Sequence, residues 1–162
     1  MGERANPGGT ADDMDRKYFS REEAEELLPM IGPALENARR QKHTIGSLTE
    51  ELSVAATRIM ALGGSLPPFA ELNRKKTQCD EGVEQLTQMI DEIQQAGCLV
   101  KDVEMGLVDF PSLREGQEVY LCWKLGEEHI GFWHGIEEGF TGRKPLDAFT
   151  KEDTPPGSSR LQ

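Results

Sequence analysis

The sequence is poor in cysteine and in positive charge, and each shortage narrows what the protein can be. Only 3 of the 162 residues are cysteines, and they are widely spaced with no CxxC pair: Cys79, Cys98 and Cys122. This pattern argues against a disulfide framework or a zinc knuckle. It favours three buried thiols in a reducing cytoplasm.

Negative charge dominates, with 29 Asp and Glu residues against 18 Lys and Arg residues and a net charge of −11. Nucleic acids and anionic membrane surfaces attract basic proteins, so neither is an expected partner. The longest run without a charged residue, Ile59–Ala70, is only 12 residues long, which is too short to span a bilayer. The opening segment also lacks the apolar stretch of a signal peptide. We therefore expect a cytoplasmic protein.

The chain length suits one domain of ordinary size. Residues 1–17 are rich in Gly, Asp and Asn, and residues 151–162 contain two prolines and small polar residues. We expect both segments to be disordered tails. Residues 18–150 should form a single α+β domain.

The first predicted helix has a clear start but an interrupted course. Ser20 is followed three residues later by Glu23, which is the pattern of a capping box. Pro29 and Pro33 follow within the apolar periodicity, and each removes a helical hydrogen bond. We therefore expect a short helix over about 20–28, a break, and a long helix to about 62.

A second helix is predicted over about 68–96, after a Gly- and Pro-rich turn. Apolar residues recur in both helices at alternating spacings of three and four, which predicts an antiparallel, coiled-coil-like helical hairpin over about 20–97. Folding about residue 65 sets Leu52 opposite Cys79 and Ile45 opposite Leu86. Lys42 and Lys76 would lie at seam positions.

The remainder has the composition of a small antiparallel β-meander with a closing loop, over about 98–149. The expected strands are Cys98–Val103, Gly106–Phe110, Gln117–Leu125 and His129–His134. We prefer a short turn after Leu125, because register follows the hydrophobic pattern; this turn would put His134 on the apolar face and Trp133 opposite Tyr120. A loop of odd length would instead place His129 and Trp133 among the apolar residues.

Several segments resemble a bacterial family, the one catalogued as domain of unknown function 2203. They are YFSREEAEELLPMIGPALE from Tyr18, LVKDVEMGLVDFP from Leu99, EVYLCWKLGE from Glu118, and GFTGRKPL from Gly139. The resemblance covers about 130 residues of the chain. It implies a compact cytosolic protein with a helical first part and a β-rich second part. The family carries no established activity, so the resemblance adds identity without a mechanism.

The residues that could bind a ligand are concentrated in the β-rich part. One histidine with two or three carboxylates is a plausible ligand set for Mn, Fe or Zn, and four residues are candidates: His134, Asp109, Glu118 and Asp102. The structural alternative treats the acids as solvated or turn-capping residues. In that alternative His134 is a core residue, hydrogen-bonded to a backbone carbonyl and to a carboxylate such as that of Asp109.

Arg143 is a candidate for binding anions, because it lies in a Gly-flanked segment and guanidinium groups clamp carboxylates or phosphates. The structural alternative is an ion pair with Asp109 or Glu118.

No phosphate-binding loop, GxSxG, HExxH or EF-hand pattern is present, so no residue is assigned a catalytic role and no cofactor is named. Whether the protein is an enzyme stays open. We favour a non-enzymatic interaction module that uses the hairpin and the sheet face, through a protein partner or self-association. The alternative is a metal- or small-ligand-binding protein, even a hydrolase-type enzyme, with a His/carboxylate site on the β-rich part.

Overall fold

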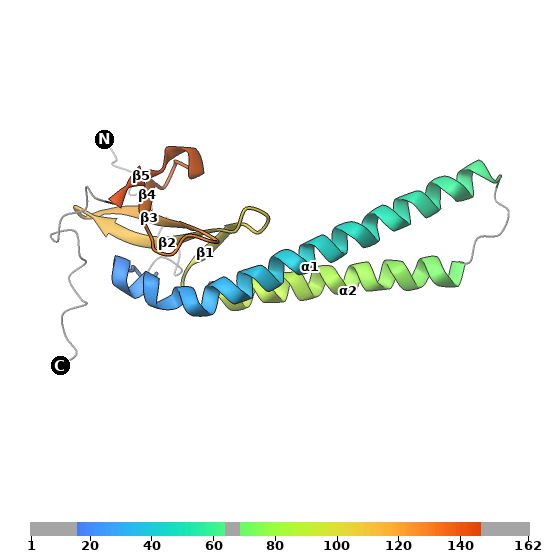
Figure 1. The fold of residues 1–162 in the computed structure, drawn as a ribbon, viewed down its shortest axis with the longest axis horizontal. Helices are drawn as coiled ribbons and strands as arrows, with labels where there is room; N and C mark the ends of the chain where they lie inside the picture. Colours follow the sequence, from blue (N-terminus) through green and yellow to red (C-terminus); the bar gives the residue numbers. More distant parts are fainter. Residues whose placement is uncertain (1–15, 64–68, 147–162) are drawn as a thin grey trace, which may run out of the picture.

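A computed structural model describes residues 16–63 and 69–146, and it shows two helices followed by an antiparallel sheet (Figure 1). The predicted α+β class and the order of its parts are confirmed. Most of the two predicted tails and the inter-helix segment 64–68 lie outside the described residues. The elements are α1 (Arg21–Ala61), α2 (Phe69–Gln94), β1 (Leu99–Asp102), β2 (Leu107–Arg114), β3 (Gln117–Lys124), β4 (Phe132–Gly135), η2 (Phe140–Gly142) and β5 (Lys144–Pro145).

Helix α1 begins where the sequence predicts, and the amide of Glu23 donates to the Ser20 hydroxyl at 3.1 Å. The predicted break is wrong, because α1 runs through both prolines without interruption. Pro29 and Pro33 are both exposed, so their rings lie on the side of the helix away from the core. The opposite side is buried at Ala24, Ile31 and Leu35, and this packing holds the helix together despite the lost hydrogen bonds.

The two helices form the predicted hairpin, with a register about one helical turn away from the expected one. The Thr49 hydroxyl, and not Leu52, lies 3.5 Å from the Cys79 sulfur. Ile45 packs on Gly82, where an added Cβ would lie 3.1 Å from its Cγ1. Lys76 is exposed, and Lys75 is instead drawn into the seam, 3.0 Å from Glu51. Seam spacing alone does not distinguish registers that differ by one turn.

The sheet is a five-strand antiparallel meander in the order β1-β2-β3-β4-β5. Strand β2 is longer than predicted and pairs with β3 as far as Arg114 opposite Gln117. Glu115 and Gly116 make the turn between these strands, with φ of 51° and 77°. Two central residues with positive φ are typical of the tight hairpin turn that matches strand twist. The predicted closing loop contains η2 and the fifth strand, and residues 147–149 lie outside the described part.

The preferred pairing of β3 with β4 is wrong by one residue. Trp133 lies opposite Leu121, and His134 lies opposite Tyr120. The long connection over 125–131 sets this register, and the amide of Ile130 in it donates to Glu25 of α1 at 3.0 Å. Trp133 therefore packs against the core, as in the odd-loop alternative, while His129 is exposed. His134 projects from the other face of the sheet.

The core lies between the sheet and the first part of α1. It is formed by Phe19, Ala24, Ile31, Leu35, Ile93, Cys98, Val108, Phe110, Leu121, Trp123, Ile130 and Leu146. Beyond this core the two helices extend together past the edge of the sheet, and we call this extension the arm (Figure 1). None of the helices in the described ranges is long and apolar enough to cross a membrane.

Candidate functional site

Three chemically different side chains meet on the face of the sheet that points away from α1. Asp109 on β2 lies opposite Cys122 on β3, and His134 on β4 lies opposite Tyr120, two residues from Cys122. The exposed fractions of Asp109, Cys122 and His134 are 2%, 1% and 3%. One ligand atom from each lies within 4.8 Å of the other two. Adjacent strands of one sheet thus hold a carboxylate, a thiol and an imidazole together.

The hydrogen bonds of His134 fix the orientation of its ring. Its Nδ1 lies 2.8 Å from the Gly135 carbonyl oxygen, which can only accept, so Nδ1 carries a hydrogen and donates it. Its Nε2 lies 3.0 Å from the Asp109 carboxylate. The carboxylate and the carbonyl thus hold the ring from opposite sides. The structural alternative from the sequence, a carbonyl and Asp109 as partners, describes these contacts correctly.

The thiol of Cys122 is not set up as a nucleophile. Burial, the charge of Asp109 and a hydrogen bond to Asp109 raise the pKa of Cys122 to about 12, against a smaller lowering effect of Arg143. A nucleophilic cysteine needs a neighbouring base and a lowered pKa. Here the histidine nitrogen that would act as base faces Asp109 instead. The geometry therefore does not support a Cys-His-Asp catalytic triad.

Arg143 lies beside this cluster with partners other than those predicted. Its Nη2 donates to the Glu127 carboxylate at 2.8 Å and to the Cys122 carbonyl oxygen at 3.2 Å. Its guanidinium carbon lies 4.2 Å from the ring centre of Phe132 and 4.9 Å from that of Phe140. Neither Asp109 nor Glu118 pairs with it. Arg143 thus fixes the segment after β4 to the end of β3.

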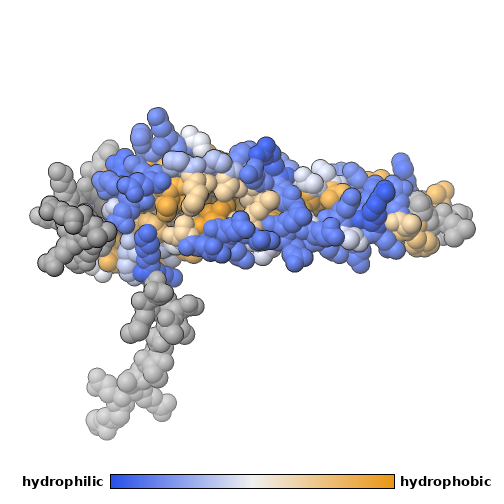
Figure 2. Space-filling model, turned by 90° about the horizontal axis from the view of Figure 1, so that it is seen from below, coloured by the Kyte–Doolittle hydropathy of each residue, from blue (hydrophilic) through white to orange (hydrophobic). Residues whose placement is uncertain are grey.

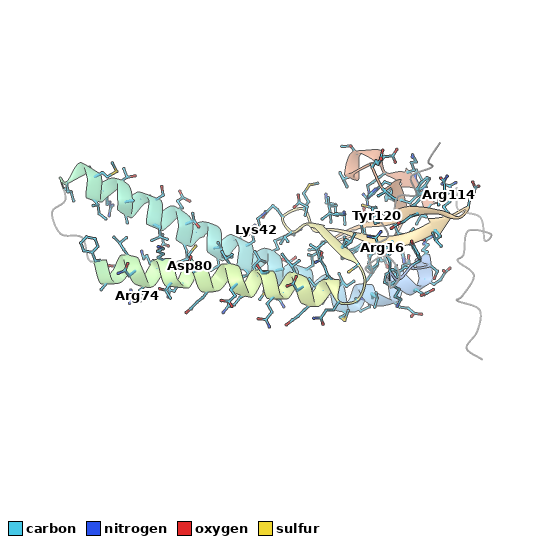
Figure 3. The ribbon with its side chains drawn as sticks, turned by 180° about the vertical axis from the view of Figure 1, so that it is seen from behind. Arg16, Lys42, Arg74, Asp80, Arg114 and Tyr120 are labelled. Atoms are coloured by element: carbon cyan, nitrogen blue, oxygen red, sulfur yellow. The ribbon has the colours of Figure 1, made fainter. Side chains whose placement is uncertain are left out.

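The other two predicted candidates lie apart from the cluster. Asp102 ends β1, and its Oδ1 accepts from the amide of Met105 at 2.8 Å, so it caps the following turn. Glu118 pairs with Arg16 near the far end of β3. Figure 3 shows Arg16 close to Tyr120 on the sheet. The contacts of Asp102 and Glu118 are those of structural residues, whereas Asp109 and His134 come together as a pair.

Sequence reasoning missed Cys122 and Glu127 as neighbours of the candidate residues. Glu127 accepts from the amide of Lys124 at 2.9 Å as well as from Arg143, although it lies in a turn where an exposed charge is expected. A signal for Cys122 did exist, because it shares a strand face with Tyr120. The register that places His134 opposite Tyr120 would also have placed it near Cys122.

The helical arm offers a second surface of a different kind. In α1 the buried residues end at Ala38, and in α2 they are Gly82 and Ile93. Figure 2 shows the arm as largely hydrophilic, with apolar patches towards its free end. Large apolar side chains are exposed along the arm, with exposed fractions of 84% for Met60, 66% for Leu62, 61% for Phe69, 49% for Val54 and 48% for Val83.

The comparison with family models identifies the chain. Residues 17–146 match the DUF2203 model, described as an uncharacterized conserved protein, and the chain belongs to this family. The match spans both the helices and the sheet, which agrees with the resemblance seen in the sequence. No curated protein and no solved structure gave a significant match.

Proposed function

We propose that this member of the DUF2203 family is a protein-interaction module whose helical arm docks against the arm of a second copy. The observation that carries the proposal is the arm itself, which extends past the core while each helix is covered by only one other helix. Isolated helices gain little stability from propensity, and they depend on packing of an apolar face. An arm of this length therefore gains from another helix beside it.

One flank of α2 presents polar and apolar side chains at a regular helical spacing. Its residues recur at spacings of four and three: Phe69, Asn73, Lys76, Asp80, Val83, Thr87 and Ile90. These spacings place them along one side of the helix, next to the stripe that faces α1. The side chains of Phe69 and Val83 on this flank are 61% and 48% exposed. We call these seven residues the flank stripe.

The charges of the flank stripe favour a second copy over an unrelated helix. Lys76 and Asp80 are both exposed and lie either side of Gln78. In an antiparallel pair with its two-fold axis beside Gln78, Lys76 of each copy lies opposite Asp80 of the other. A two-fold interface makes every such contact twice, so the same surface is complementary to itself. Figure 3 shows Asp80 on the arm, well away from Tyr120 and Arg16 at the sheet.

A charge exchange on the full chain tests this interface. We expect sedimentation equilibrium to show a monomer–dimer equilibrium for the natural sequence. Lys76→Glu or Asp80→Lys alone should weaken dimerisation by tenfold or more, because each creates like-charge contacts twice. The double variant Lys76→Glu with Asp80→Lys should restore it.

Lys101→Glu is the matched control, since it makes the same charge change at an exposed position of β1, in the sheet and not in the arm. It should leave dimerisation unchanged. A natural sequence that stays monomeric at every concentration would overturn the proposal, as would a double variant no better than the single ones.

We place this module in the cytoplasm. The free thiols of Cys79, Cys98 and Cys122 support that location, because they suit a reducing compartment.

A further inference from the structure

The cluster on the sheet is independent of the arm, and its chemistry is unusual for a purely structural contact. Burying a charged or polar side chain is unfavourable unless it is paired or coordinates a metal. Asp109, Cys122 and His134 are all at least 97% buried on one sheet face. Each offers a different ligand atom, an oxygen, a sulfur and a nitrogen, to the same small volume.

We propose that Asp109, Cys122 and His134 together bind one divalent transition-metal ion, with Zn²⁺ as the best match. Zinc accepts thiolate, imidazole and carboxylate ligands in one site. The sulfur and nitrogen atoms disfavour Mg²⁺ and Ca²⁺, which prefer oxygen ligands. Three protein ligands is also the number found at zinc sites that keep one position open for another molecule.

The imidazole is already oriented as a metal ligand would be. Histidines that bind metals almost always donate the hydrogen on their other ring nitrogen to a carbonyl or carboxylate, which fixes the tautomer. The contact from Nδ1 of His134 to the Gly135 carbonyl, at 2.8 Å, does this. Nε2 then faces both carboxylate oxygens of Asp109, each at 3.0 Å. A metal ion would lie between these groups, with Nε2 and the carboxylate as ligands.

The charges of the site also suit a dication. On binding the metal, the Cys122 thiol would release its proton to solvent. The resulting thiolate and the Asp109 carboxylate would together carry two negative charges, which balance an ion of charge +2. Arg143 is next to Cys122, and its own charge is paired with Glu127. The ligands come from three neighbouring strands, so their backbone positions are held by the β2–β3 and β3–β4 ladders. Sites built on strands are held more rigidly than sites on loops.

A Co²⁺ titration tests this proposal without any assumption about activity. The full chain is freed of metal with a chelator under reducing conditions and titrated with Co²⁺, with long equilibration because the ligands are buried. We expect a near-ultraviolet cobalt–thiolate charge-transfer band and the strong visible bands of tetrahedral cobalt, both reaching a plateau at one ion per chain. Added Zn²⁺ should abolish both.

Near-isosteric variants assign the ligands. Cys122→Ser should abolish the charge-transfer band, and Asp109→Asn and His134→Gln should each weaken binding by tenfold or more. Cys79→Ser is the matched control, because Cys79 is a thiol on α2 away from the sheet, and it should leave the titration unchanged. Circular dichroism checks that each variant is folded.

If the cluster only stabilises the fold, the natural sequence will show no charge-transfer band with Co²⁺, and the proposal is then wrong. It is also wrong if Cys122→Ser retains the band. Neither result affects the proposal of dimerisation through the arm, which is tested separately with the charge variants of α2.

Discussion

The two ends of this molecule differ in how completely they are packed. At the sheet end, α1 and the sheet enclose side chains such as Phe19, Phe110 and Leu121, which are at most 1% exposed. In the arm, the same two helices protect each other on one side only, and Met60 and Phe69 are mostly exposed. The same pair of helices thus contributes to a fully packed core at one end and has a partly exposed apolar surface at the other. The fold needs the first, and we propose that the second is where another copy of the chain docks.

The largest expected effect comes from comparing two phenylalanines, one from each end. Phe110 is fully buried, with its ring centre 5.5 Å from that of Phe19, while Phe69 is 61% exposed. Phe110→Ala should lower the free energy of unfolding by about 3–5 kcal/mol through lost burial and a cavity. Phe69→Ala should change it by less than about 0.5 kcal/mol when the chain is dilute enough to be monomeric. Urea denaturation followed by circular dichroism gives both values, and equal losses would contradict the comparison.

A smaller effect concerns pH and the buried thiols. Burial raises the pKa of Cys98 at the sheet end to about 11, whereas the pKa of an unfolded cysteine is about 8.5. Between these values the unfolded chain loses its thiol proton and the folded chain keeps it. The free energy of unfolding therefore falls as pH rises through this window.

The loss from Cys98 should amount to about 2–3 kcal/mol by pH 11, at about 1.4 kcal/mol for each pKa unit. Cys98→Ala should show a correspondingly shallower decline in urea denaturation curves recorded across this window. Parallel declines would show that Cys98 is not the cause.

At neutral pH a thiol reagent should modify Cys79 in the arm first, since Cys98 and Cys122 are buried.

The smallest effect compares two glycines within the helices. An added Cβ at Gly46 meets nothing within 4 Å, so Gly46→Ala should stabilise α1 by about 0.5–1 kcal/mol. At Gly82 the same atom would lie 3.1 Å from Cγ1 of Ile45 and 3.2 Å from Nε2 of Gln41. Gly82→Ala should therefore gain less or lose stability, because the seam must adjust. Thermal denaturation followed by the helical signal separates them, and an equal gain in both would mean that the seam is loose.

Local signals in the sequence predicted the elements well, and long-range packing explains the errors. Ser20 caps α1 as expected, because a cap depends on a few neighbouring residues. The break at Pro29 and Pro33 was wrong, since the core packing of Ile31 and Leu35 outweighs two lost hydrogen bonds. The sequence around a proline does not reveal how firmly the rest of the helix is held.

The candidate site was predicted in part for a related reason. The sequence predicts the contact between Asp109 and His134. It does not place Cys122 beside them, because the expected register of β4 is wrong by one residue. Alternation of apolar and polar residues defines a register when one face of a strand is exposed to solvent. Here Cys122 and His134 are buried on the outer face while Leu121 is buried on the inner one, so alternation carries little information. The connection before β4 is held by the contact of Ile130 with Glu25, which joins residues that are distant in the sequence.

The most direct test of whether a second copy covers the arm is hydrogen exchange followed by mass spectrometry, at several concentrations of the full chain. At low concentration the amides of β2 and β3 should be strongly protected, while those of α1 beyond Ile45 and of α2 before Gly82 should exchange quickly. As concentration rises, the arm alone should gain protection, and Lys76→Glu should remove that gain. Strong, concentration-independent protection of the arm would contradict the account, because it would mean that two helices alone complete it.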